Sequence, residues 1–123
     1  MLRIGFFSNF KGADTVLIAG NSEDIQSLSR ALAEVATGGM LPLHETANVS
    51  KKYPVTMFAS TVSPGNRAYW WKCTDMEIDE INGMLDPLTR GENGHHYFNL
   101  EGTDVQLIVS VGEYSSNWWQ EYG

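Results

Sequence analysis

The sequence predicts one α+β domain, residues 1–123, in which two helices pack on one face of a mainly antiparallel sheet. Segments rich in Val, Ile, Leu and aromatic residues occur in three pairs, with turn-forming residues between the members of each pair. Two amphipathic segments separate the pairs, so the predicted order is β-β-α-β-β-α-β-β. Strands joined by tight turns pair antiparallel, and both helices must bury an apolar stripe, which places them together on one face of the sheet.

The first strand pair is expected at residues 2–10 and 15–19, because the residues between them have the chemistry of a turn. A helix is then expected to start at Asn21-Ser22-Glu23-Asp24, where an amide or a hydroxyl can cap exposed backbone N–H groups, and to extend to about residue 37. Its apolar stripe consists of Ile25, Leu28, Leu32 and Val35. Two glycines end this helix.

The middle of the chain is predicted to hold a loop and a second hairpin. Residues 40–52 contain Pro42 and no clear periodicity, so we expect a loop with one short extended piece. Residues 55–62 and 67–73 have the composition of strands, and Ser-Pro-Gly-Asn at residues 63–66 is a strong turn signal. We therefore expect these two strands to pair antiparallel.

The second helix is predicted to start with a capping box, in which Thr74 and Glu77 satisfy each other's backbone N–H groups. It should end before Pro87, because proline disfavours a helical conformation of the residue that precedes it. Its buried stripe consists of Ile78, Ile81 and Leu85.

A third strand pair, residues 94–100 and 105–114, is predicted to complete the sheet. The tail that follows contains Trp118, Trp119 and Tyr122, which is more aromatic area than a chain leaves in water without a use. Because the two tryptophans are adjacent, we expect them to project in different directions. One would pack on the core and the other would remain available to a partner.

Composition and charge argue against several classes of function. Eight Lys and Arg stand against fifteen Asp and Glu, and a net charge of −7 disfavours binding to nucleic acid or to anionic membranes. The apolar runs are too short for a membrane-spanning helix. The single cysteine, Cys73, excludes an intramolecular disulfide and suits a reducing compartment, so we expect a cytoplasmic protein.

The negative charge is concentrated in the second half of the chain. Residues 1–61 carry equal numbers of acidic and basic side chains, whereas the acidic excess and all four tryptophans lie beyond them. Aromatic anchors beside unbalanced charge are typical of a protein interface. The second helix presents acids on its solvent side, and we expect no basic side chain one turn away to neutralise them. The predicted partner-binding residues are Asp75, Asp79, Glu80, Asp86, Glu113, Trp118, Trp119, Glu121 and Tyr122.

Candidate catalytic residues are few and poorly spaced. His95 and His96 are adjacent in a predicted strand, so their side chains point to opposite faces and cannot readily share a metal ion. Cys73 is expected to be a small buried apolar residue rather than a nucleophile. No phosphate-binding glycine motif and no hydrolase or metalloprotease motif occurs. We therefore expect no enzyme activity, no catalytic residue, no metal and no cofactor.

Two segments carry a family resemblance. Residues 16–35 read Val-Leu-Ile-Ala-Gly-Asn-Ser-Glu-Asp-Ile-Gln-Ser-Leu-Ser-Arg-Ala-Leu-Ala-Glu-Val, a strand that ends in a turn before a Leu-rich helix. Residues 94–100 read Gly-His-His-Tyr-Phe-Asn-Leu and lead to Leu-Ile-Val-Ser-Val at residues 107–111. Together they resemble the small α+β immunity proteins of bacterial polymorphic-toxin and contact-dependent inhibition systems. This chain departs from that pattern at residues 97–99, where Tyr-Phe-Asn stand in place of a second His and an acid.

The resemblance implies a cytoplasmic protein that binds and neutralises one cognate toxin, commonly a nuclease or another enzyme acting in the cytosol, without catalysis of its own. A toxin of basic charge would suit the acidic, Trp-rich second half of the chain. One alternative is a small-molecule sensor or minor enzyme with a pocket near residues 40–52 and the His95 and His96 strand, using His44 or Cys73. Another is an acidic mimic of DNA, which the neutral first half disfavours.

Overall fold

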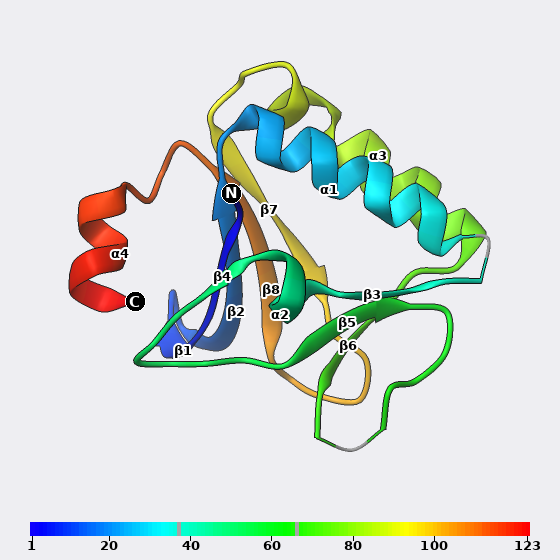
Figure 1. Cartoon of the computed structure of the whole chain (residues 1–123), viewed down its shortest axis with the longest axis horizontal. Helices are drawn as coiled ribbons and strands as arrows, with labels where there is room; N and C mark the ends of the chain where they lie inside the picture. The colour runs from blue at the N-terminus through cyan, green and yellow to red at the C-terminus, as the bar shows by residue number, and fades with distance from the viewer. Residues whose placement is uncertain (37, 66) are drawn as a thin grey trace.

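The computed structural model describes residues 1–36, 38–65 and 67–123. Its strands form a larger and a smaller sheet, and its helices pack against them (Figure 1). In these residues the elements are, in order, β1 (Arg3–Phe10), β2 (Ala13–Gly20), α1 (Ser22–Val35), β3 (Met40–Pro42), α2 (Leu43–Thr46), β4 (Asn48–Val49), β5 (Met57–Ser60), β6 (Tyr69–Lys72), α3 (Asp75–Thr89), β7 (Gly94–Asn99), β8 (Gln106–Val111) and α4 (Ser116–Tyr122). The α+β class is as the sequence predicted.

The larger sheet has five strands in the order β4-β1-β2-β8-β7, and it is mixed rather than mainly antiparallel. The expected first and third hairpins are confirmed, because β1 pairs antiparallel with β2, and β7 pairs antiparallel with β8. The two hairpins meet through their second strands, which run in the same direction and pair parallel from Thr15 and Gln106 to Gly20 and Val111. The expected antiparallel sheet is wrong at this central pair, since no tight turn connects the strands there and their direction is free to be parallel.

The smaller sheet has the order β3-β5-β6, and the expected second hairpin within it is wrong. β5 and β6 pair parallel, with Met57 opposite Tyr69 and Ser60 opposite Lys72. The connection after β5 therefore returns along the whole length of the strand before β6 begins, and the Tyr69 N–H donates to the Thr56 carbonyl at 2.9 Å. Turn position 66 lies outside the described residues. The loop expected at residues 40–52 contains β3, the short helix α2 and β4.

Both predicted helices and both capping arrangements are present. At the start of α1, the Asp24 N–H donates to Asn21 Oδ1 at 2.8 Å and the Asn21 N–H donates to Asp24 Oδ2 at 2.9 Å. The helix buries the four apolar residues that its spacing predicted. Its expected end at residue 37 lies outside the described residues. Thr74 and Glu77 form the predicted capping box of α3.

The expected end of α3 before Pro87 is wrong, because the helix continues to Thr89. Leu88 is 3% exposed and extends the buried stripe by one turn, and the Thr89 carbonyl accepts a hydrogen bond from Gln26 Nε2 at 2.7 Å. These contacts with the core and with α1 hold the last turn in place. They offset the backbone hydrogen bond that a proline cannot donate.

The two faces of the larger sheet are covered differently. α1 and α3 lie side by side over one face, as predicted, and α4 lies on the opposite side (Figure 1). Alternation along the strands separates the two cores, so Val16 and Ile18 pack beneath α1 and α3 while Leu17 packs toward α4. Within the described ranges, no helix has the length and apolar character of a membrane span.

α4 is fixed to the sheet by an aromatic cluster. Trp119 is 7% exposed and its ring meets Phe7 edge-on at 5.8 Å between centroids, while the half-buried Trp118 ring lies 5.3 Å from Phe7. The expectation that one tryptophan packs inward is met by Trp119. The aromatic cluster consists of Phe7, Phe10, Tyr53, Tyr114, Trp118, Trp119 and Tyr122.

Truncation of Trp119 should release α4 from the sheet. We expect Trp119→Ala to lower the free energy of unfolding by about 3–5 kcal/mol, as for other buried aromatic residues, and Trp118→Ala to cost less because its ring is only half buried. The Trp119 Nε1 atom is buried without a hydrogen-bond partner among the described residues. Trp119→Phe should therefore retain more stability than the alanine variant, since no hydrogen bond is lost. Urea denaturation of the three variants checks this order, and equal losses for all three would contradict it.

Candidate partner-binding surfaces

The exposed side of α3 carries the first group of predicted partner-binding residues. Asp75, Asp79, Glu80 and Asp86 are all exposed. Asn82 is turned toward α1, where its Oδ1 accepts a hydrogen bond from Ser29 Oγ at 2.6 Å. Helical spacing places the three aspartates on the same flank as Asn82, whereas Glu80 lies on the flank that faces β7. The acids of α3 therefore point along two flanks of one helix.

The expectation that no basic side chain neutralises these acids is wrong at one position. Arg90 Nη2 lies 3.1 Å from Asp86 Oδ2, one turn away, and both side chains are exposed. Such a pair contributes little stability, but it removes local charge. Within the parts of the chain that the structure describes, Asp75, Asp79 and Glu80 form no ion pair.

The second group of predicted residues lies on the opposite side of the larger sheet. Trp118 and Trp119 belong to the aromatic cluster, so most of their ring surface is already covered by the chain itself. Glu121 and Tyr122 are exposed on α4, and Glu113 precedes this helix. The structure therefore separates the nine predicted residues into an α3 surface and an α4 surface, with the sheet between them.

Glu113 joins the end of β8 to β7 through two polar contacts. Its carboxylate accepts a hydrogen bond from Ser110 Oγ at 2.7 Å and lies 2.8 Å from His95 Nδ1. Partial burial raises the pKa of Glu113, but the hydrogen bonds from Ser110 and His95 outweigh it, so the pKa lies below its usual value of 4.5. Ser110 donates to the carboxylate and not to the imidazole, so this arrangement does not generate a serine nucleophile.

The remaining candidates for catalysis or metal binding are His96, His44 and Cys73, and their surroundings suit a structural role. His96 neighbours His95 on β7 and its side chain points to the opposite face, as predicted. His44 Nδ1 lies 3.1 Å from the Met57 carbonyl oxygen. Cys73 is fully buried, and desolvation followed by the nearby Glu77 charge raises its pKa to about 12, which keeps the thiol protonated. In the described residues, no three His, Cys, Asp or Glu side chains are grouped as a metal site.

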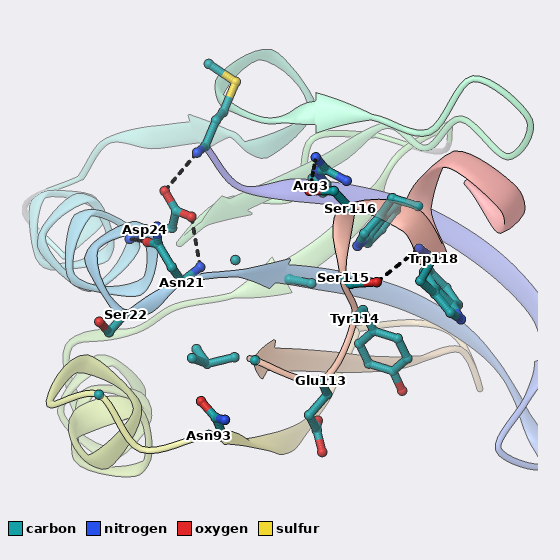
Figure 2. A pocket seen from close by; sticks show the side chains of 17 residues that line it. Arg3, Asn21, Ser22, Asp24, Asn93, Glu113, Tyr114, Ser115, Ser116 and Trp118 are labelled. Carbon is teal, nitrogen blue, oxygen red and sulfur yellow. Dashed lines mark hydrogen bonds and ion pairs between the residues drawn. The ribbon is translucent and has the colours of Figure 1, made fainter.

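A pocket of about 670 Å³ lies at the carboxyl ends of the parallel strands β2 and β8, with the starts of α1 and α4 beside it (Figure 2). This is a common place for ligand binding in sheets with parallel strands. Several of its polar groups are bonded to one another, because Asp24 caps α1 and Arg3 Nη2 donates to Ser116 Oγ at 3.2 Å. A second pocket, of about 410 Å³, is lined by residues 48–52, within the loop that the small-molecule alternative favoured, but neither His95 nor His96 lines it.

Sequence reasoning missed a groove of about 290 Å³ between α3 and β7, which we call the α3–β7 groove. Met84, 38% exposed, contributes apolar surface beside acidic side chains, while Tyr97, 48% exposed, borders the groove from β7 with its ring beside His95 on the other face of the sheet. The groove is lined by Trp71, Lys72, Glu77, Glu80, Ile81, Met84, Tyr97, Phe98, Asn99 and Glu101. No local pattern could have identified it, because it exists only where β7 becomes the outer strand of the sheet.

No protein-family model, curated protein or solved structure matches this chain. Its function is therefore proposed from the chemistry and geometry of these surfaces.

The Glu113 contacts should make stability depend on pH. A carboxyl whose pKa is lowered by folding stabilises the protein above its usual value of 4.5, and this stabilisation is lost as the pH falls through the lower folded value. Glu113→Gln should therefore be less stable than the unsubstituted chain near pH 7, and the difference should shrink as the pH falls below 4.5. Denaturation midpoints at a series of pH values measure this. If the stability difference between the two proteins grows on acidification, the stabilising role given to the Glu113 carboxylate is wrong.

Proposed function

We propose that this chain is a bacterial cytoplasmic immunity protein, which binds and neutralises a cognate protein toxin through the exposed acids of α3 and the adjoining α3–β7 groove. The observation that carries the proposal is the set of exposed α3 acids without an ion-pair partner in the described residues, Asp75, Asp79 and Glu80, beside exposed apolar side chains. The family resemblance of the sequence supplies the class of partner.

The charge of this surface suits the toxins implied by the resemblance. An enzyme that cleaves nucleic acid must attract phosphates, so its substrate-binding surface is basic. An acidic surface on the immunity protein would speed encounter with such an enzyme and would compete with its substrate for the same site. The net charge of −7 adds to this attraction over longer distances.

The same surface offers apolar anchors, which charge alone would not supply. Met76 is 79% exposed and Met84 is 38% exposed on the same helix as the acids. Aromatic and methionine side chains bury large areas at protein interfaces, and they carry much of the binding energy when they become desolvated. We therefore place the centre of the interface at α3 and β7, where charge and apolar surface coincide.

The α4 surface is the competing location for the interface. Tyr122 is 49% exposed, and Glu113 and Glu121 supply charge near it. Its tryptophans, however, are engaged in holding α4 to the sheet, so their truncation would act first on folding. Variants of α3 and α4 can be compared directly to decide between the two surfaces.

The proposal predicts that a reading frame adjoining this one encodes the toxin, and the test uses that toxin domain, made inactive by substitution of its catalytic residue. The unsubstituted chain should form a stable complex with this domain and should restore growth of cells that express the active toxin. Asp79→Lys and Glu80→Lys should each slow association roughly three- to tenfold, because electrostatic steering is weakened. The matched control is Glu45→Lys, which makes the same change of charge at an exposed position of α2.

Stopped-flow association rates at low and high salt complete the test, since rising ionic strength should slow the unsubstituted chain more than the lysine variants. No complex and no growth rescue would refute the proposed function. If Tyr122→Ala weakens binding and both α3 variants bind as tightly as the control, the interface lies on α4.

A further inference from the structure

We infer that β7 accepts an extended basic segment of the partner protein as an additional strand, with the side chains of that segment seated in the α3–β7 groove. The inference rests on the proposed function and specifies how the partner is held. It follows from three features of the structure: an open sheet edge, a groove whose wall is that edge, and the charge of the groove.

The larger sheet has one covered edge and one open edge. Along the outer side of β1, the Ser50 N–H donates to the Ile4 carbonyl at 2.8 Å, and the Phe6 N–H donates to the Tyr53 carbonyl at 3.0 Å. On the opposite edge, β7 pairs only with β8, and no residue of β7 forms a backbone hydrogen bond elsewhere within the described ranges. Every second residue of β7 therefore directs its N–H and C=O groups away from the sheet, where another strand can pair with them.

The outer edge of β7 forms one wall of the α3–β7 groove. Tyr97, Phe98 and Asn99 all line the groove, although the side chains of successive strand residues point to opposite faces of the sheet. These are the last three residues of β7, so the groove borders the carboxyl-terminal end of the strand, beside Trp71 and Lys72 of β6. A segment lying in the groove is therefore within reach of the unpaired backbone groups of β7.

The charge of the groove selects the occupant. Glu77, Glu80 and Glu101 contribute three carboxylates, and Lys72 contributes one ammonium group. A second copy of this chain pairing through β7 would bring the same carboxylates close together, which disfavours self-association. An acidic segment is disfavoured for the same reason. A segment rich in Lys or Arg would neutralise the groove while it completes the sheet.

The strand geometry also specifies the sequence pattern of the segment. Side chains of an added strand alternate between the two faces of the sheet. Those on the α3 side meet Glu80 and the exposed Met84, which suits the charged end and the apolar stem of lysine or arginine. Those on the other side lie beside Tyr97, which suits an apolar or aromatic residue. The occupant is therefore an extended segment in which basic and apolar residues alternate.

A blocked peptide of alternating lysine and valine, about eight residues long, is the probe for this inference. Added to the isotope-labelled full chain, it should shift the amide resonances of β7 and of the exposed side of α3, and it should slow hydrogen exchange of the outward-facing β7 amides. The control peptide, in which glutamate replaces lysine, should leave the spectrum unchanged. Absence of binding by the lysine peptide would overturn the inference.

Two series of N-methylated peptides distinguish strand addition from attraction of charge alone. Methylation of every second amide removes either the N–H groups that face β7 or those that face solvent, with no change in charge. The series that lacks the N–H groups facing β7 should bind at least tenfold more weakly than the parent peptide, which corresponds to about 1.4 kcal/mol. The series that lacks the solvent-facing N–H groups should bind like the parent peptide. Equal binding of both series would overturn strand addition.

Substitutions in the protein provide an independent check. Glu80→Lys should weaken binding of the lysine peptide by about tenfold, whereas Glu45→Lys, the matched change of charge on α2, should not. Equal effects of the two substitutions would contradict a role of the groove. If sedimentation shows a dimer of the chain in which β7 amides are protected, the edge belongs to a second copy and the inference is wrong.

The two proposals can fail separately. If the toxin domain is bound and neutralised but both N-methylated series bind alike, the immunity function stands and strand addition fails. If the peptide binds with the expected alternation but the toxin domain does not bind, the open edge is a strand acceptor and the immunity function fails.

Discussion

The parallel pairing of β2 with β8 is the constraint on which the rest of the structure depends. These two strands join the first and last hairpins into one sheet, and their central residues are almost completely buried on both faces. Backbone groups placed between two cores have no water to bond with, so the paired ladder satisfies them and fixes the register of both hairpins. A shift by one residue would exchange the side chains of the two cores.

This central pair also determines where the surfaces lie. Because β8 lies beside β2, its hairpin partner β7 must be the outer strand, and the helix that precedes β7 is brought next to an open edge. The opposite edge is covered by the segment that follows β4. Beyond β8, the chain crosses to the far face and the aromatic cluster holds α4 there. Charge and apolar surface therefore coincide at α3 and β7, while Trp118 and Trp119 serve the fold on the other side.

Local sequence signals predicted the elements in which neighbouring residues cooperate. The Asn21 and Thr74 caps, the buried stripes of the two long helices and the two outer hairpins all depend on contacts within a few residues, and the structure contains them. Local sequence signals failed at Pro87, where burial of Leu88 and a hydrogen bond from Gln26 of α1 extend the helix. They also failed between β5 and β6, where a turn motif predicted a hairpin but the strands pair parallel. Of the predicted partner-binding residues, exposure of the α3 acids followed from helical spacing, whereas the ion pair of Asp86 was missed.

By itself, the sequence determined the two long helices and their buried sides, the first and last hairpins, and the concentration of excess negative charge in the second half of the chain. Only the tertiary structure decided that β2 and β8 join the hairpins in parallel, that β5 and β6 also pair parallel, and which edge stays open. These outcomes depend on how distant segments share burial and backbone pairing, which no short stretch of sequence encodes. For the same reason Tyr97, Met84 and Glu101 line one groove, although nothing in their local sequence relates them.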